Sequence, residues 1–248
     1  MHYIFVKKDR DARIDIRLEE SPPPTPKTPH LHATSQGLYV IHPELRRPFL
    51  LSFDGGALDH RARRGGEMLF RATGASKRVG LTIVDATAGL CREAFLMASA
   101  GANVYALEKN LALYSLAHDA ITRSQSPVIS RLHLHYGDAL HLVPSLAPDV
   151  VYLDPMFPES TKTAAVGKEA VILRAFARHT EPLEERRLLE CALEHAYYRV
   201  VVKRPLKAPP LTGPKPTASL KGKAIRYDLY GKRKLPTQGQ KVRSKVSP

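Results

Sequence analysis

The segment of this chain that could most clearly do chemistry is an apolar run that ends at an acid, a proline and an aromatic ring. Asp149-Val150-Val151-Tyr152-Leu153 leads into Asp154-Pro155-Met156-Phe157-Pro158. Continuous apolar residues predict a strand buried on both faces, and the strand must stop at Pro155, which has no N–H for a sheet ladder. Asp154 and the Pro155 carbonyl could accept hydrogen bonds from an amine while Phe157 stacks on the ring that carries it. We therefore predict an acceptor site for an amino-bearing nucleobase, with Asp154, Pro155 and Phe157 as its catalytic residues.

A second segment has the pattern of a ligand-binding turn between a strand and a helix. Asp85-Ala86-Thr87-Ala88-Gly89 ends in glycine, and a helix N-terminus with free N–H groups is expected just after it. Glu108 follows Gly89 by nineteen residues, which is where nucleotide-type folds hold a ribose. Because the turn lacks the full G-x-G-x-x-G pattern, it favours an adenosine cofactor without phosphates, S-adenosylmethionine, over a dinucleotide. An ordinary turn with a surface glutamate is the alternative.

Asp138, Lys203 and Arg204 follow two further predicted strands. Asp138 could accept from the adenine amino group of the same cofactor, although an aspartate at this position also caps helices well. The apolar run 200–202 would deliver Lys203 and Arg204 to the ligand-binding edge of the sheet, where they would clamp phosphates or simply face solvent. We predict phosphate contacts.

Residues 55–67 are rich in glycine and arginine. They predict a loop that touches nucleic acid or a flexible linker, and the two are compatible. The RNA contacts expected in this segment are His60, Arg61, Arg63 and Arg64. His60 is not assigned a catalytic role, because a lone histidine in a basic loop is more often a structural or RNA contact.

The elements that must position these residues alternate between strands and helices from about residue 79. Strands are predicted at 81–86, 104–108, 132–136, 150–154, 199–203 and 225–230, and helices at 92–100, 111–123, 164–179 and 183–197. This order predicts an α/β fold with a Rossmann-like, mostly parallel sheet covered by helices on both faces. The carboxyl ends of its strands would bring the acids and cations together at one edge.

The chain divides into three zones by composition. Short strand-like pieces at 3–6, 13–18, 38–41 and 49–53 surround a proline-rich connector. They predict a small β-rich N-terminal subdomain that, with its basic glycine-rich linker, occupies 1–71, ahead of the main α/β domain at 72–230. Residues 231–248 are basic and almost free of apolar side chains, so a disordered tail is expected. A merely solvated tail and an RNA-contacting one are both open.

Charge and cysteine content limit the partners and the compartment. Lys and Arg outnumber Asp and Glu by 38 to 24, a formal net charge of +14, which favours a polyanionic partner. Cys91 and Cys191 are the only cysteines and form no zinc-type cluster, so a reducing cytoplasm and no structural metal are expected. The N-terminus lacks the pattern of a signal peptide, and no apolar run reaches membrane-spanning length. We therefore expect a cytoplasmic protein.

Together these segments resemble the bacterial small-subunit ribosomal RNA guanine-N2 methyltransferases of the RsmJ type. The resemblance runs from about residue 53 to 230 and rests on segments 55–61, 85–90, 107–110, 150–158, 201–205, 208–211 and 226–230. The Leu-Asp-Pro-Met-Phe-Pro block is the most specific, because Met156 replaces the second proline that is usual in amino-methyltransferases. The resemblance implies a class I methyltransferase fold that uses S-adenosylmethionine. It also implies a substrate: a guanine near the 3′ end of 16S rRNA in the small ribosomal subunit.

The resemblance also implies which residues contact the cofactor. In addition to Asp85 and Gly89 of the turn, the contacts carry over onto Arg92, Glu93, Glu108, Lys109, Asp138, Ala139 and Asp154. The chain departs from the family pattern at four places. Cys91 stands where glycine is usual, Glu93 replaces an aspartate, Lys109 replaces an arginine, and Asp138-Ala139 replaces a serine pair.

Other functions fit parts of the pattern. A methyltransferase of the same fold could act on another amine, such as adenine N6 or a protein glutamine. A non-catalytic rRNA-binding assembly factor would keep the fold without binding the cofactor. A dinucleotide-dependent oxidoreductase is disfavoured by the missing glycines.

Overall fold

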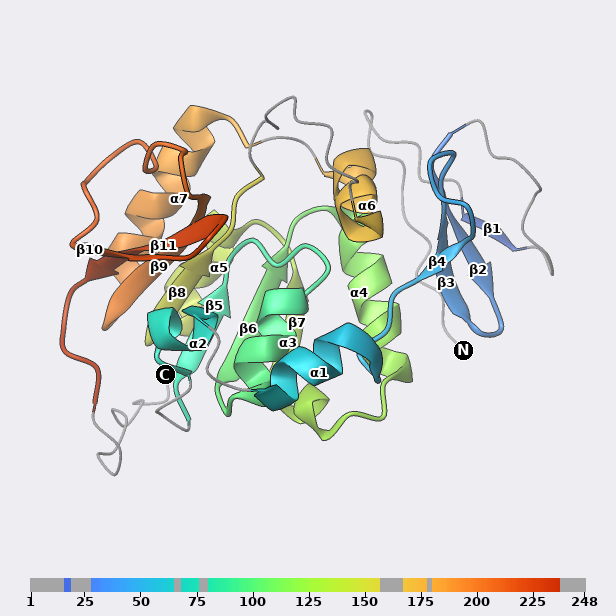
Figure 1. The fold of residues 1–248 in the computed structure, drawn as a ribbon, viewed down its shortest axis with the longest axis horizontal. Coiled ribbons are helices and arrows are strands. Elements are labelled where there is room, and N and C mark those ends of the chain that lie inside the picture. Colours follow the sequence, from blue (N-terminus) through green and yellow to red (C-terminus); the bar gives the residue numbers. More distant parts are fainter. Residues whose placement is uncertain are drawn as a thin grey trace.

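A seven-stranded sheet forms the centre of the protein (Figure 1). The computed structural model describes residues 16–18, 28–64, 68–75, 80–156, 167–177 and 180–236. The strand order is β10-β11-β9-β8-β5-β6-β7. The strands are β5 (Thr82–Asp85), β6 (Asn103–Glu108), β7 (Leu132–Tyr136), β8 (Val150–Leu153), β9 (Arg199–Pro205), β10 (Ala218–Lys221) and β11 (Ile225–Gly231).

The five neighbouring strands β7, β6, β5, β8 and β9 run parallel to one another. Strand β11 pairs antiparallel with β9, and β10 pairs antiparallel with β11. Every residue of the central strands β5 and β8 is buried, as their continuous apolar sequence predicts. The mostly parallel sheet is therefore confirmed. It extends one strand further than predicted, because β10 pairs with the outer edge of β11.

Helices cover both faces of this sheet and enclose two apolar clusters. The helices are α3 (Arg92–Ser99), α4 (Leu111–Arg123), α5 (Ala139–Leu146), α6 (Lys168–Phe176) and α7 (Pro182–His195). On one face, Phe95 of α3 and Leu113 of α4 pack in the cluster that includes Ile83. On the other face, Val143 of α5 and Leu189 of α7 pack in the cluster that includes Val84. Because successive side chains of a strand point to opposite faces, both clusters are built on the same strands.

A second, four-stranded sheet lies at the opposite end of the molecule from β10 and β11 (Figure 1). It contains β1 (Ile16–Leu18), β2 (His30–Thr34), β3 (Gly37–Ile41) and β4 (Phe49–Leu50). The small β-rich N-terminal region is thus confirmed, with a strand at 30–34 that was not predicted. The strand predicted at 3–6 lies outside the described residues.

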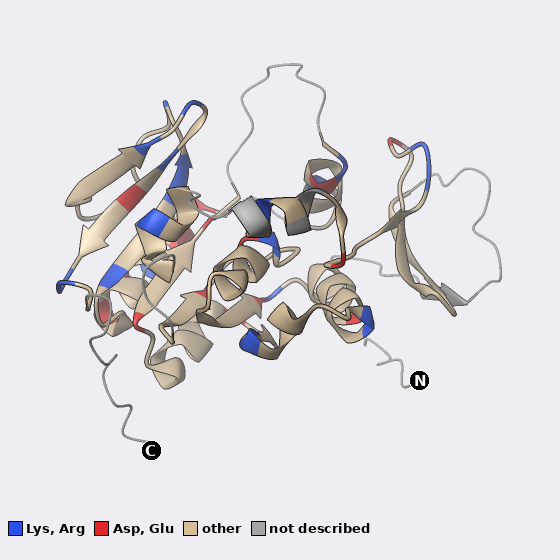
Figure 2. Ribbon diagram, turned by 60° about the horizontal axis from the view of Figure 1, so that its bottom comes forward, with Lys and Arg blue, Asp and Glu red and all other residues tan. Residues whose placement is uncertain are grey.

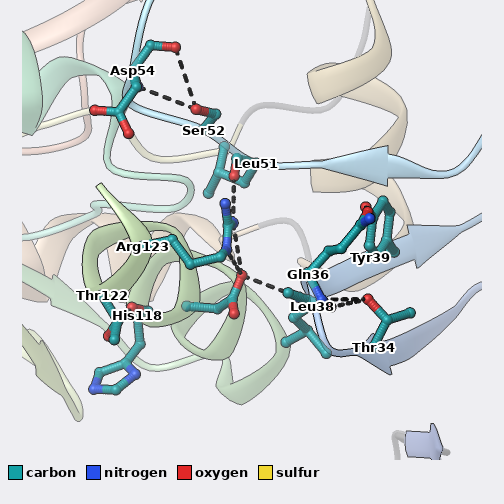
Figure 3. A network of polar contacts seen from close by, with 12 residues as sticks. Thr34, Gln36, Leu38, Tyr39, Leu51, Ser52, Asp54, His118, Thr122 and Arg123 are labelled. Carbon is teal, nitrogen blue, oxygen red and sulfur yellow. Dashed lines mark hydrogen bonds and ion pairs between the residues drawn. The ribbon is translucent and has the colours of Figure 1, made fainter. Parts of the chain in front are cut away.

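The small sheet is fastened to α4 by two side chains (Figure 3). Arg123 donates through Nη2 to the Leu51 carbonyl (2.7 Å) and through Nε to Oδ2 of Asp119 (2.9 Å). The same carboxylate oxygen accepts from the Leu38 N–H (3.1 Å). Gly37 is required here, because its φ is +138° and a Cβ would lie 2.5 Å from Arg123 Nε. The chain reversal between β2 and β3 is therefore fitted to α4.

Two segments differ from the sequence prediction. Residues predicted as a glycine-rich loop form helix α1 (Gly56–Arg64), which packs against α3 through the buried Leu58 and is followed by α2 (Met68–Thr73). The start of the expected disordered tail is ordered. Lys232 donates to the carbonyls at the end of α7, and Arg233 lies 4.4 Å over the Tyr197 ring. Residues 237–248 lie outside the described part of the chain.

Candidate functional site

Three parallel strands end in carboxylates at the same edge of the sheet. Asp85 is the last residue of β5, Glu108 is the last residue of β6, and Asp154 directly follows β8. Asp138 comes two residues after β7 and precedes α5. Because β5, β6, β7 and β8 are parallel neighbours, all four acids meet at the edge where open α/β sheets bind ligands.

The turn between β5 and α3 (residues 86–91) is tied to both neighbouring strands. The Ala86 N–H donates to the Tyr152 carbonyl of β8 (3.0 Å), and the Ala88 N–H donates to the Leu107 carbonyl of β6 (3.1 Å). The Thr87 hydroxyl accepts from the Asp154 N–H (2.6 Å). The turn is thereby held in one conformation before any ligand arrives.

Gly89 and Glu108, which the sequence paired by their spacing, contact one another. The Gly89 N–H donates to Oε2 of Glu108 (2.7 Å), and the Asn110 N–H donates to Oε1 (2.6 Å). Burial raises the pKa of the Glu108 carboxyl, although these backbone donors oppose the shift. Each oxygen keeps acceptor capacity for the hydroxyls of a ribose, since a carboxylate oxygen has two lone pairs.

Cys91 occupies a backbone conformation that favours glycine. Its φ is 57° and its ψ 24°, in the left-handed region, and it stands immediately before α3. The side chain is fully buried, and burial raises the pKa of its thiol well above the usual value. The conformation gives a physical reason for the glycine that is usual here in the resembling family.

Asp85 and Asp138 have local roles that are visible in the structure. Asp85 is buried, which raises its carboxyl pKa well above the ordinary value, and its Oδ1 accepts from the Thr87 N–H (3.2 Å). Asp138 caps α5 by accepting from the Leu140 N–H (2.9 Å), and Ala139 is the buried first residue of that helix. Contact of these residues with a cofactor remains a prediction.

The groups at this edge fit S-adenosylmethionine. Carboxylates are acceptors for its hydroxyl and amino groups, and their negative charge suits its sulfonium. Arg92, at the start of α3, donates to the Ser52 carbonyl (2.7 Å) and pairs with Glu169 of α6 (2.5 Å). Within the described residues, α6 also reaches the turn, because a Cβ on Gly89 would lie 3.3 Å from Leu173.

Lys203 was predicted to bind phosphate, and the structure places it between two acids. Its Nζ lies 2.6 Å from Oδ2 of Asp154 and 3.0 Å from Oε1 of Glu93. The acids stabilise the ammonium and raise its pKa despite burial. Two carboxylates therefore balance the charge of Lys203 inside the protein, and a contact between Lys203 and a substrate phosphate remains a prediction.

Arg204, also predicted to bind phosphate, makes contacts within the protein. Its side chain is buried, its Nε donates to the Pro209 carbonyl (3.0 Å), and its Nη1 lies 3.7 Å from the Glu185 carboxylate of α7. A strand alternates its side chains between faces, so Lys203 and Arg204 could not both reach the same edge region. Its contacts join β9 to α7 and to the segment that follows β9, and a phosphate contact by Arg204 remains a prediction.

The structure describes some of the remaining predicted residues and not others. Lys109 is exposed and pairs with Glu184 of α7. His60 and Arg61 are exposed on α1, whereas the side chains of Arg63 and Arg64 lie outside what the structure describes. Pro155 is buried, and Phe157 falls in the undescribed segment 157–166.

The sequence reasoning did not identify Thr87 and Asn110. The Thr87 hydroxyl joins the turn to Asp154. Asn110 caps α4 through its side-chain oxygen and donates from Nδ2 to the Phe176 carbonyl of α6 (2.6 Å). Asn110 could have been found as an N-cap just ahead of an apolar helix, but no local signal points to Thr87.

None of the helices in the described residues combines the length and apolar character that crossing a membrane would need.

Comparison with known proteins assigns the family. Residues 22–232 match the family model for SAM-dependent methyltransferases. Ribosomal RNA small subunit methyltransferase J of Chromohalobacter salexigens is 42% identical over 76% of this chain and 78% of its own length. The protein of the same name from Dechloromonas aromatica is 39% identical over 83% and 88%. The crystal structure of a SAM-dependent methyltransferase from Neisseria gonorrhoeae superposes with a TM-score of 0.67 at 31% identity, covering 86% of both chains. The chain therefore belongs to the SAM-dependent methyltransferases and, within them, to the ribosomal RNA small subunit methyltransferase J family.

Proposed function

We propose that this protein methylates the exocyclic N2 amine of a specific guanosine near the 3′ end of 16S rRNA in the small ribosomal subunit. The observation that carries the proposal is the direct hydrogen bond between the Asp154 N–H and the Thr87 hydroxyl. It joins the backbone of the residue that carries the acceptor carboxylate to the turn that fits the methyl donor. The names of the relatives supply the class of substrate, the RNA of the small subunit.

The reaction requires an amine that is a poor nucleophile to be held against the donor. When bound, S-adenosylmethionine supplies the methyl group as an electrophile on sulfur. Asp154 and the Pro155 carbonyl accept the amine hydrogens and favour the pyramidal geometry of the attacking nitrogen. Phe157 stacks on the guanine ring, a contact worth about 1–3 kcal/mol. Positioning supplies much of the remaining acceleration, and the guanine must be unstacked to reach the site.

The charge of the protein supports a polyanionic substrate. The net charge is +14, and Figure 2 shows Lys and Arg on several elements rather than on one. His60 and Arg61 are exposed on α1, and Arg63 and Arg64 belong to the same helix. These four side chains are our proposed RNA contacts, with α1 as the helix that presents them.

The product nucleoside tests the proposal. Small subunits from a strain that lacks the enzyme are incubated with the protein and methyl-labelled S-adenosylmethionine, and their RNA is digested to nucleosides for mass spectrometry. Label in N2-methylguanosine is the expected result. Label in N6-methyladenosine, or in a ribosomal protein, would instead support the same fold acting on another amine.

A non-catalytic assembly factor of the same fold is separated by a binding measurement. The proposed enzyme binds S-adenosylmethionine in isothermal titration calorimetry without RNA present. Binding to small subunits together with no detectable binding of the cofactor would contradict the proposal.

A further inference from the structure

Among the residues that the structure describes, Lys203 is the only cation that forms an ion pair with Asp154. It reaches the site from the carboxyl-terminal part of β9 and places Nζ 2.6 Å from Oδ2 of Asp154. Glu93, in the first turn of α3, holds the same ammonium at 3.0 Å. All three side chains are between one fifth and three tenths exposed, so solvent weakens these attractions only in part.

Lys203 holds one oxygen of the Asp154 carboxylate and leaves the other one free. Because Lys203 occupies Oδ2, Oδ1 is the oxygen of Asp154 that remains for a substrate amine. Glu93 restrains the flexible lysine chain from the other side, and Asp154 is anchored by its own N–H on Thr87. With its backbone fixed on Thr87 and one carboxylate oxygen held by a restrained lysine, Asp154 presents its free oxygen in a defined direction.

Several other groups bear on the charge of Asp154. They are Arg204 of β9, which favours its ionised form; Glu93 of α3 and Asp85 of β5, which oppose it; and Tyr152 of β8, which is buried beside it. Arg61 of α1 acts on Glu93 in turn. Burial is the largest influence and raises the pKa of Asp154, and Lys203 is the strongest opposing one. Without Lys203, protonation of Asp154 would begin at a higher pH.

We propose that Lys203 is a positioning residue for methyl transfer, with its ammonium fixing Oδ2 of Asp154 and keeping that carboxylate ionised for the acceptor amine. This assignment rests on the proposed function of Asp154 as the amine acceptor. It replaces the phosphate-binding role that the sequence alone favours for Lys203. Glu93 is the partner that holds the lysine in place.

The pH dependence of single-turnover methyl transfer tests the assignment, with cofactor and small subunits at saturation. Lys203→Met is expected to lower the maximal rate by about tenfold or more and to move the acid limb of the profile to higher pH. Lys203→Arg, which restores a cation, is expected to return the acid limb towards that of the wild type. The matched control is Lys207→Met, because Lys207 is an exposed cation four positions away, and its profile should follow the wild type.

Binding measurements separate positioning from phosphate recognition. The assignment predicts that Lys203→Met binds small subunits as tightly as the wild type and with the same salt dependence. Weaker subunit binding, a shallower salt dependence and an unmoved acid limb would overturn it and restore the phosphate role. The wild-type product nucleoside is recorded in the same assay. A product other than N2-methylguanosine would refute the proposed substrate, while the shift of the acid limb would still decide the role of Lys203.

Discussion

At the level of single residues, the surroundings of Glu93 and of three acids at the strand ends move their pKa values in different directions. Burial raises the pKa of Asp85, Glu108 and Asp154. For Glu93, burial is outweighed by Lys203 and Arg61, so its pKa is lowered. Burial therefore favours the protonated form of the three acids at the strand ends, but at Asp154 the ammonium of Lys203 opposes this effect, and Glu93 is the ionised partner that restrains Lys203.

Asp85→Asn is expected to stabilise the protein at neutral pH. The folded-state pKa of Asp85 lies above its unfolded value, so its contribution is most favourable below about pH 4 and declines as pH rises through the folded-state pKa. Asparagine removes this cost and can still accept from the Thr87 N–H. Thermal unfolding should show a higher Tm for the variant at pH 7, by about 2–4 °C per kcal/mol for a chain of this size, and a smaller gain near pH 4.

Asp138→Asn is the matched control, because asparagine caps a helix as well as aspartate does. Its Tm should follow the wild type across the same pH range. A Tm for Asp85→Asn that is no higher than the wild type at pH 7 would contradict the cost assigned to the buried carboxyl.

Sequence reasoning found the acids but not their partners. The spacing between Gly89 and Glu108 predicted that both serve one ligand site, and the structure joins them by a hydrogen bond. The sequence did not predict the partners of Lys203 and Arg204, because these partners are distant in sequence or on the other face of the strand. Asp154 and Glu93 lie 49 and 110 residues from Lys203. The residues around a strand predict that its end carries a charge, but they do not predict which charged side chain will pair with it.

At the level of elements, the described parts of the structure follow the sequence most closely where apolar periodicity is strong. Helix α4 and strand β7 have the predicted bounds, and Asn110 marks the start of α4 with a side-chain cap. Among the elements that were not predicted, three were obscured for different reasons. Glycine and arginine obscured α1, Pro144 lies inside α5, and β10 is an edge strand with mostly exposed residues.

Arg123→Ala is expected to loosen the small N-terminal sheet from α4. The Leu51 carbonyl loses its charged donor and Asp119 loses its cation, which should lower the free energy of unfolding by about 1–3 kcal/mol. Hydrogen exchange should increase first at the amides of β3 and β4. Arg131→Ala, at an exposed position in the short helix η2 (Pro127–Arg131), is the control, and equal exchange in the two variants would refute the fastening role of Arg123.

At the level of the whole molecule, the two sheets share one apolar cluster. Leu31 and Val40 of the small sheet belong to the cluster that contains Ile83 and Phe95 of the main domain. Phe53, between the sheets in sequence, stacks on Phe95 with ring centroids 5.2 Å apart. Composition suggested a boundary near residue 71, but composition cannot predict that apolar side chains from both sides of the boundary pack together.

The net charge of the molecule predicts a salt dependence that distinguishes its two ligands. Binding to small subunits should weaken by about tenfold or more between 50 and 200 mM salt, because cations of the protein displace counterions from RNA. Cofactor binding should change little over the same range, since S-adenosylmethionine is not a polyanion. Both constants can be measured on one preparation, and a salt-independent affinity for subunits would contradict recognition through RNA phosphates.

The central claim is that Asp154 accepts the methyl-receiving amine beside the cofactor turn. The most direct test is the single-turnover rate of methyl transfer to small subunits by Asp154→Ala, in a variant shown to retain its Tm and its calorimetric affinity for S-adenosylmethionine. Because the alanine backbone N–H can still donate to Thr87, the fold should persist. We expect a loss of about 100-fold or more, whereas a wild-type rate would contradict the role of Asp154 as the amine acceptor.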